Sequence, residues 1–415
     1  MFDLDNWQEI WSSVKKHKLR TLLTAFGVFW GILMLVLLLG AGKGLQNGVY
    51  QMFSSAARNS IYIWPEITRT PYKGLAPGRK ITFDNGDYQA ILHKVPDIQY
   101  LSPGLNPNGK INMVYRQKSM AFTLKGVHPD LQHIKTMAFP KGRFLNILDL
   151  QQERKVAVIG ERIREVFFPK QDPIGQFINI QGVPFRVVGC FTTEESASHK
   201  EDAETVFVPL YTLQHTFDYK DNISLFTVCP RPNVPAEKVE AAIRSLMAAR
   251  HTIQPQDAEA MGSFNSEKEF NKYVSLFAGI RLFIWIVGAG TIVAGIIGVS
   301  NIMLIIVKER TREIGVRKAL GATPASIVSL IIMESVVITS AAGYVGLITG
   351  MGIIAGVRNF LDSSGFKSEF FKDPQIDLQV ALTAVVILVV TGALAGLVPA
   401  GNAARINPIE ALKTE

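Results

Sequence analysis

The chain is poor in cysteine and in charge, and it lacks the common catalytic signatures. Two of its 415 residues are cysteine and 19% are charged. No histidine is followed directly by glutamate, so the zinc motif H-E-x-x-H is absent, as is the G-x-S-x-G turn of serine hydrolases. No cysteine pair has the spacing of a zinc finger. The sequence therefore predicts neither a metal site nor a catalytic site, and the isolated histidines are expected to have surface or structural roles.

A phosphate-binding loop is also missing. The motif G-x-x-x-x-G-K-[ST] requires serine or threonine after its lysine, but Lys43 is followed by Gly44 and Lys110 by Ile111. We therefore expect no cofactor on this chain. If the protein performs work, ATP and Mg²⁺ must be bound by another chain.

The two cysteines, Cys190 and Cys229, fall in a region that we expect outside the cytoplasm. An oxidising compartment would join them if they lay close together. The alternative is a pair of small buried apolar side chains, because free cysteine is among the most buried residue types. The sequence leaves both possibilities open.

What the chain does contain is long apolar runs, concentrated toward its two ends. Each is long enough to cross the hydrocarbon layer, which requires roughly 20 helical residues. Basic residues flank these runs, and the positive-inside rule places both termini and the connector Lys308–Ala322 in the cytoplasm. The predicted fold is an α-helical membrane protein with four transmembrane helices and a large α+β extracytoplasmic domain between spans 1 and 2. The predicted segments are a cytoplasmic amphipathic helix (1–20), span 1 (21–44), the extracytoplasmic domain (45–275), span 2 (276–307), a cytoplasmic connector helix (308–323), span 3 (324–357), a short extracytoplasmic loop (358–377), span 4 (378–400) and a cytoplasmic tail (401–415).

The N-terminal segment repeats apolar residues at spacings of three and four. Leu4, Trp7, Ile10, Trp11 and Val14 fall on one helical face. This pattern predicts an amphipathic helix on the inner membrane surface, in preference to a basic flank with incidental aromatics. A cleavable signal peptide is disfavoured, because the apolar run that follows is about 20 residues long and exceeds the roughly 7–15 of a signal core.

The region between the first two spans changes to short alternating segments broken by glycine and proline. Phe177–Ile180 and Val183–Val188 predict a hairpin around Gln181-Gly182, because glycine supplies the positive φ of a tight turn. Ile111–Tyr115 and Ala121–Leu124 predict a second hairpin. A further strand and two helices are predicted at Lys155–Ile159, Glu161–Phe168 and Pro235–Arg250.

The formal net charge of the chain is +8. Much of the cationic excess lies beside the apolar runs, where anionic lipid headgroups are the expected partner. Nucleic-acid binding is therefore not predicted.

The connector Lys308–Ala322 combines charges, glycines and apolar positions. Glu313 and Arg317 have the favourable i,i+4 order for a helical ion pair, and Ile314 and Leu320 offer apolar contact. On its charges alone, the connector indicates a solvated loop that obeys the positive-inside rule. Its other features are Gly315 and Gly321, which allow close approach or helix termination, and Thr323-Pro324, which cap and begin the next helix.

Span 3 carries glycines at spacings of three and four, and one carboxylate. Gly343, Gly346 and Gly350 predict close helix packing, although glycine is common in membrane helices generally. Glu334 is a functional candidate because an intramembrane carboxylate is costly. A polar packing role, by snorkelling or with a cationic neighbour near the inner surface, is favoured over a proton relay, since the spans contain no second carboxylate.

Eight segments spread along the chain form a recognisable combination. They are Arg312–Ala322, Pro399–Arg405, Asn407–Leu412, Gly126–Asp130, Gly142–Phe144, Val156–Gly160, Asp172–Gln176 and Gly182–Gly189. Together these segments resemble the MacB/FtsX-type ABC transporter permeases, the mechanotransmission group. The connector segment is similar to the family's coupling helix, the two C-terminal segments to its C-terminal signature, and the five middle segments to its extracytoplasmic core domain. The resemblance runs nearly end to end, and its specificity comes from the combination of segments.

The resemblance implies a permease of the bacterial inner membrane, either a homodimer or a heterodimer with a related permease, with cytoplasmic ABC ATPase subunits bound at the connector. ATP hydrolysis would then move the extracytoplasmic domain without a substrate crossing the bilayer. The MacB subtype carries its ATPase on the same chain, whereas this chain starts at the membrane helix, so we expect a separate ATPase and a non-catalytic permease subunit. The residues expected to couple to the ATPase are Glu309, Arg312, Glu313, Ile314, Gly315, Arg317, Lys318, Leu320 and Gly321.

The substrate cannot be predicted from one sequence, but its class can be ranked. Efflux or lipid and lipoprotein extraction, with possible periplasmic or outer-membrane partners, is favoured over control of a cell-wall hydrolase, which usually has a smaller outer domain. The alternative function is a membrane receptor or regulator that controls such an extracytoplasmic partner. A receptor predicts a cytoplasmic signalling module, and the predicted cytoplasmic segments are too short for one.

Overall fold

A computed structural model describes residues 18–53, 57–192, 200–364, 371–375 and 378–408. The amphipathic helix predicted at 1–20 therefore lies outside the described residues, except for its last three positions, which begin helix α2. The chain divides into two units. One unit comprises Met1–Gly48 with Ser275–Glu415, and the other is Val49–Val274.

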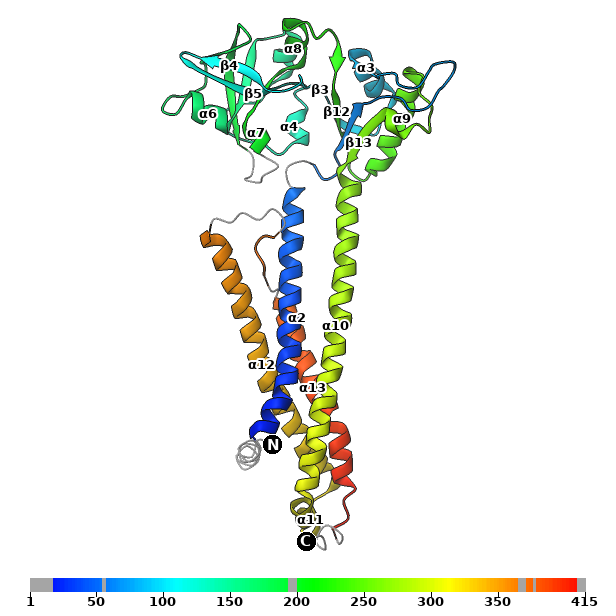
Figure 1. Ribbon diagram of the computed structural model, residues 1–415, viewed down its shortest axis with the longest axis vertical. Coiled ribbons are helices and arrows are strands. Elements are labelled where there is room, and N and C mark those ends of the chain that lie inside the picture. The colour runs from blue at the N-terminus through cyan, green and yellow to red at the C-terminus, as the bar shows by residue number, and fades with distance from the viewer. Residues whose placement is uncertain (1–17, 54–56, 193–199, 365–370, 376–377, 409–415) are drawn as a thin grey trace. The chain divides into compact units, whose positions relative to one another are not determined.

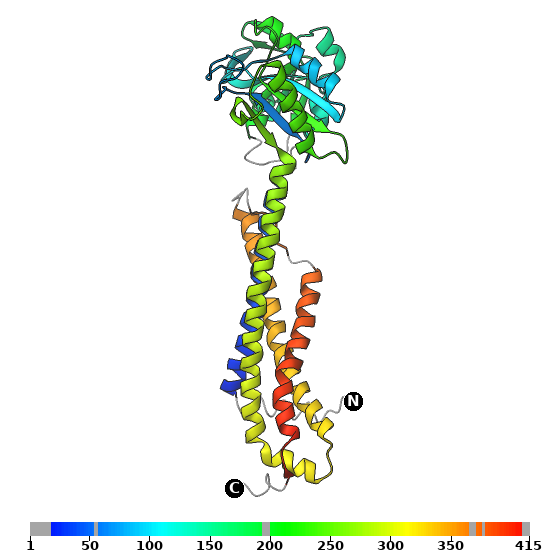
Figure 2. The same cartoon turned by 90° about the vertical axis from the view of Figure 1, so that its right-hand side faces the viewer.

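The first unit is built from four long helices, as predicted. Each contains an apolar stretch long enough to cross a membrane. The two views show these helices running alongside one another, with a short helix, α11, at one end (Figures 1 and 2). The helices are α2 (Lys18–Met52), α10 (Ser266–Glu309), α11 (Thr311–Ala319), α12 (Pro324–Ser364) and α13 (Leu378–Ala404).

The helices extend beyond the predicted spans. Helix α12 continues to Ser364, so the first part of the predicted loop 358–377 is helical. The predicted span ended at Val357 because Arg358 interrupts the apolar run. A charged residue ends an apolar run, but it does not interrupt the backbone hydrogen bonds of a helix. Neither glycine nor proline occurs between Val357 and Ser364, so the helix continues.

The second unit contains the predicted α+β domain. Six strands close into a ring in the order β10-β7-β9-β8-β4-β5, because β10 pairs with β5 in parallel as well as with β7. Its apolar core includes Met113, Phe122, Ile178 and Phe185. The strands are β1 (Ile61–Pro65), β2 (Phe83–Asp84), β3 (Ile98–Leu105), β4 (Ile111–Tyr115), β5 (Lys118–Val127), β6 (Ala138–Gly142), β7 (Val156–Gly160), β8 (Phe177–Ile180), β9 (Val183–Thr192), β10 (Thr205–Pro209), β11 (Asn222–Ile223), β12 (Leu225–Pro230) and β13 (Met261–Asn265).

A second lobe of this unit continues the sheet through β5-β3-β12-β1-β13. Helices α3 and α9 belong to this lobe, away from the ring (Figure 1). Their buried residues, including Ile91, Val239 and Ile243, share a core with Phe83 and Phe226. The helices of the unit are α3 (Asn85–Lys94), α4 (Leu131–Ile134), α5 (Ile147–Gln151), α6 (Glu161–Phe167), α7 (Lys200–Ala203), α8 (Leu210–Thr216) and α9 (Ala236–Arg250).

Both predicted hairpins are confirmed. Strands β8 and β9 are antiparallel, and Gln181 and Gly182 between them have φ values of 49° and 90°. Two successive positive φ values match the twist of a two-residue hairpin turn. Strands β4 and β5 also pair antiparallel, but β5 begins at Lys118, three residues earlier than predicted, because the turn needs only Arg116 and Gln117.

Both cysteines are buried free thiols. Cys190 lies in the core of the ring, where burial, the largest influence, raises the pKa of its thiol to about 11. Cys229 lies in β12, and its Sγ is 3.4 Å from Oδ1 of Asn59. The structure therefore has no disulfide between Cys190 and Cys229, and each is a small buried side chain.

Candidate functional site

Helix α11 forms the centre of the predicted connector. The predicted i,i+4 ion pair is present, with Arg317 3.0 Å from Glu313. Gly321 ends the turn with φ 97°, a conformation that glycine adopts without steric cost. The backbone N–H of Ser326 donates to Oγ1 of Thr323 over 3.3 Å, which caps α12 as predicted.

The two faces of α11 differ in character. Ile314 and Gly315 are buried, and Ile314 packs into the core of the four long helices. Leu320 was predicted to make apolar contact, but it is 83% exposed, and Val316, one turn earlier, is 42% exposed. Sequence reasoning missed Val316, although its i,i+4 spacing from Leu320 was a usable signal. We call the exposed residues Arg312, Glu313, Val316, Ala319 and Leu320 the exposed α11 face.

Lys318 holds α11 against the end of α13. Its Nζ donates to the carbonyl oxygens of Ala404 and Ile406 at 2.6 and 2.8 Å. These carbonyls lie at the C-terminal end of α13, where a helix leaves acceptors unsatisfied and favours a cation. Lys318 therefore positions α11, and Glu309, which was assigned to the same set, is the last residue of α10.

A buried ion pair ties the start of α11 to α12. Nη1 of Arg310 lies 3.5 Å from Oε2 of Glu334, whose side chain is 4% exposed. Oε1 of Glu334 has no hydrogen-bond partner among the described residues. Glu334 borders a cavity of about 20 Å³, which is large enough for one water molecule. Arg310 thus supplies the cationic neighbour that a polar packing role for Glu334 requires.

The glycines of span 3 at positions 343, 346 and 350 lie at helix contacts. A Cβ at Gly346 would lie 2.7 Å from the carbonyl oxygen of Phe29, and one at Gly350 would lie 2.7 Å from Cγ1 of Val36, both on α2. A Cβ at Gly343 would collide with Leu388 of α13. These positions let α12 approach both neighbours closely.

Helix α13 contributes a second small-residue contact that the sequence analysis missed. A Cβ at Gly392 would lie 2.8 Å from Cα of Val336, and one at Gly396 would lie 2.9 Å from Oγ of Ser335. The i,i+4 spacing of the two glycines is the small-xxx-small signal of membrane helix contacts, and it was available in the sequence.

We expect Gly346→Leu to destabilise the helical unit while Gly352→Leu does not. At Gly346 the new side chain meets backbone, and overpacking of this kind costs ~1–3 kcal/mol or more. At Gly352, on the same helix, a Cβ would have no neighbour within 4 Å among the described residues, apart from the backbone of its own helix. The check is the thermal midpoint of each full-length variant in detergent. Equal midpoints for the two variants would contradict the packing assignment.

Polar clusters in the second unit have structural roles. Asp87, the N3 residue in the capping box of α3, is fully buried and receives hydrogen bonds from Arg250 at 2.6 Å and His251 at 2.8 Å. Burial alone would raise the pKa of the Asp87 carboxyl, but the His251 and Arg250 hydrogen bonds outweigh it and hold the pKa below its usual value. The cluster joins α3 to α9. Among the described residues, no group of three His, Cys, Asp or Glu side chains is placed to hold a metal ion.

Comparisons with known proteins agree with this architecture. Residues 21–246 match the family described as the MacB-like periplasmic core domain, and residues 285–408 match the FtsX-like permease C-terminal family. The chain is 28% identical to the macrolide export ATP-binding/permease protein MacB of Shewanella sp. (strain W3-18-1), over 97% of this chain and 59% of that protein. It is 30% identical to the protein of the same name from Psychrobacter arcticus, over 97% of this chain and 58% of that protein. The chain thus spans less than two thirds of the length of these relatives.

A solved structure, the periplasmic region of MacB from Actinobacillus actinomycetemcomitans, aligns with 53% of this chain and 95% of that chain, at 18% identity and a TM-score of 0.44. The family matches cover both units of the chain, since one takes in span 1 with most of the large domain and the other takes in the remaining spans. This multi-pass inner-membrane protein, with four apolar spans and a periplasmic-type core domain after the first, belongs to the MacB/FtsX-type ABC transporter permeases.

Proposed function

We propose that this protein couples ATP hydrolysis by an ABC ATPase to motion of its periplasmic domain, and so drives export or extraction of a substrate. The observation that carries the proposal is the exposed α11 face. It presents the apolar pair Val316 and Leu320 beside Arg312 and Glu313 on a helix whose other face is anchored. Such a mixture of apolar and charged side chains is suited to docking a protein surface.

The contacts around α11 connect it to the long helices. Lys318 joins it to α13, and the Arg310–Glu334 pair joins its first turn to α12. Helix α12 in turn packs on α2 at Gly346 and Gly350. Because packed elements transmit displacement, a push on α11 would reach every one of these helices. Helices α2 and α10 carry the chain into and out of the large unit.

Orientation and partners are part of the proposal. The basic residues of the connector favour a cytoplasmic α11 and cytoplasmic termini. We propose that the ATPase is a separate subunit and that the permease acts as a dimer, either with itself or with a related chain. The relatives are named for macrolide export, and for this chain we propose an efflux or lipid-type substrate, with a periplasmic or outer-membrane partner.

The test is purification from native membranes in mild detergent, followed by mass spectrometry of the bound proteins. The wild-type chain is expected to retain an ABC ATPase, and the Glu313→Arg, Arg317→Glu double variant is expected to lose most of it. Double reversal keeps an intrahelical pair, so the helix survives while its surface charges are inverted. The matched control reverses the exposed pair Arg162 and Glu165 on α6 of the large unit and is expected to retain the ATPase. Absence of any ATPase from the wild type, even after crosslinking, would favour a receptor or regulator instead.

A further inference from the structure

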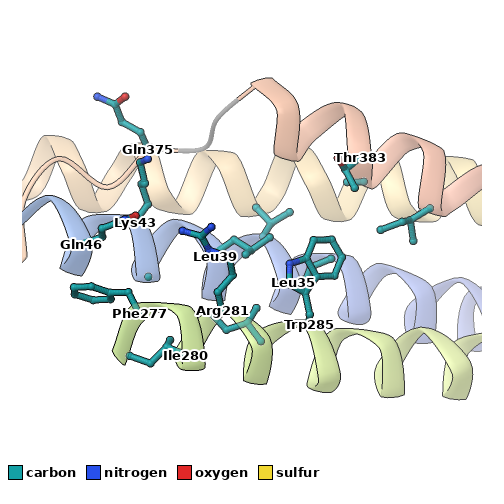
Figure 3. A pocket seen from close by; sticks show the side chains of 15 residues that line it. Leu35, Leu39, Lys43, Gln46, Phe277, Ile280, Arg281, Trp285, Gln375 and Thr383 are labelled. Carbon is teal, nitrogen blue, oxygen red and sulfur yellow. The ribbon is translucent and has the colours of Figure 1, made fainter. Parts of the chain in front are cut away.

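A cavity of about 390 Å³ lies among α2, α10 and α13, at the end of the helical unit away from α11. This volume falls within the roughly 300–1,000 Å³ range of small-molecule sites. Figure 3 shows side chains of α2 and α10 meeting in it, with Arg281 reaching from α10 toward Leu39 of α2. Nothing in the coupling arrangement around α11 uses this cavity.

The lining of the cavity combines polar and apolar side chains. On α2, Lys43 and Gln46 lie farther from α11 than Leu35 and Leu39 do, by one to three helical turns. On α13, Thr383 likewise precedes Ala384 and Ile387. On α10, Arg281 lies between two apolar parts of the lining, with Phe277 and Ile280 before it and Ile284 and Trp285 after it. A cavity that offers a cation beside apolar side chains suits an amphiphile.

Among the described residues that line the cavity, Arg281 is the charged side chain without a partner. It is an exposed side chain at the start of the uncharged run 282–307 of α10, and it makes no ion pair or hydrogen bond with any part of the chain that the structure describes. Lys43 already has a polar interaction, so the argument rests on Arg281 alone. None of the described lining residues is acidic. A guanidinium in a membrane span is costly unless an anion or water reaches it.

We propose that the cavity binds an anionic phospholipid, with the headgroup phosphate on Arg281 and an acyl chain against Leu35, Leu39 and Trp285. Arginine pairs with phosphate through two parallel hydrogen bonds, which favours it over a point charge at such a site. The cation of the lining then meets the headgroup of the lipid, and the apolar side chains meet its acyl chain. This inference is independent of the proposed coupling function, because no residue of the exposed α11 face contributes to it.

Native mass spectrometry of the full-length protein, released from nanodiscs, tests the proposal. The nanodiscs contain equal amounts of phosphatidylglycerol and phosphatidylcholine with the same acyl chains. The variants are Arg281→Gln, which removes the charge, and Leu39→Trp, which fills the cavity and keeps the charge. The control is Arg358→Gln at the same end of the helical unit, where the arginine pairs with Asp373 at 3.0 Å and does not line the cavity.

The wild type is expected to retain one phosphatidylglycerol in preference to phosphatidylcholine, as is Arg358→Gln. Arg281→Gln is expected to bind phosphatidylglycerol roughly tenfold more weakly, because a charge-assisted bond is lost. Leu39→Trp is expected to lose the lipid as well, and size-exclusion chromatography confirms that it is folded. Equal retention of the two lipids by the wild type, or equal retention of phosphatidylglycerol by Arg281→Gln and wild type, overturns the proposal. Either result would show that Arg281 meets only the bulk headgroups.

Discussion

A Leu320→Asp variant is expected to lose at least tenfold in its affinity for the ATPase while keeping the thermal midpoint of the wild type. Leu320 is 83% exposed at the end of α11, so the isolated permease gains little stability from it. Burying a leucine side chain at an interface contributes about 1.5–3 kcal/mol. An aspartate at this position loses that free energy of burial and adds the cost of burying a charge at the interface. Since about 1.4 kcal/mol is a factor of ten in affinity, a tenfold loss is the lower bound.

The measurement is ATPase activity in reconstituted vesicles, together with the amount of ATPase retained during purification. Leu320→Met is expected to behave as wild type, because it conserves volume and apolar character. The matched control is Leu148→Asp, since Leu148 is also an exposed leucine, 47% accessible, but belongs to α5 of the large unit. If Leu320→Asp retained full ATPase binding and activity, the exposed α11 face would not be the docking surface.

Local patterns were sufficient to predict the large features of the fold. The four spans followed from long apolar runs, and the β8–β9 hairpin followed from alternating residues around Gln181 and Gly182. Both signals depend on neighbours in the sequence. The ring was not predictable in this way. Its closure depends on the parallel pairing of β5 with β10, which joins Thr123 to Thr205 across a long sequence separation.

In the candidate site too, features set by neighbours in the sequence were predictable, and features set by contacts between elements were not. The Glu313–Arg317 pair was predictable because it lies within one helix. The exposure of Leu320 was not, because it depends on which side of α11 faces the other helices. Nor could sequence show that Lys318 donates to carbonyl oxygens of Ala404 and Ile406, since those groups belong to another element. The end of the third long helix was also not predicted. Arg358 ends the apolar run, but α12 continues beyond it to Ser364.

An Arg310→Met variant is expected to be destabilised by about 3 kcal/mol, because it leaves the buried carboxylate of Glu334 without its cation. The double variant Arg310→Met, Glu334→Met is expected to recover most of this loss. Replacing a buried pair by apolar side chains of similar volume is often neutral or stabilising, whereas removing one partner is not. The comparison uses thermal and denaturant unfolding of the four members of the cycle in the same detergent.

The exposed neighbour Arg312 provides the matched control. Arg312→Met removes the same charge two residues away, at a side chain outside the buried pair, and is expected to leave stability unchanged. Strict additivity of the Arg310 and Glu334 effects would mean that the two groups do not interact in the membrane. Recovery in the double variant would instead identify the pair as the link between α12 and the first turn of α11. The ATPase activity of this stable double variant would then report how much of the coupling passes through that link, separately from the stability of the fold.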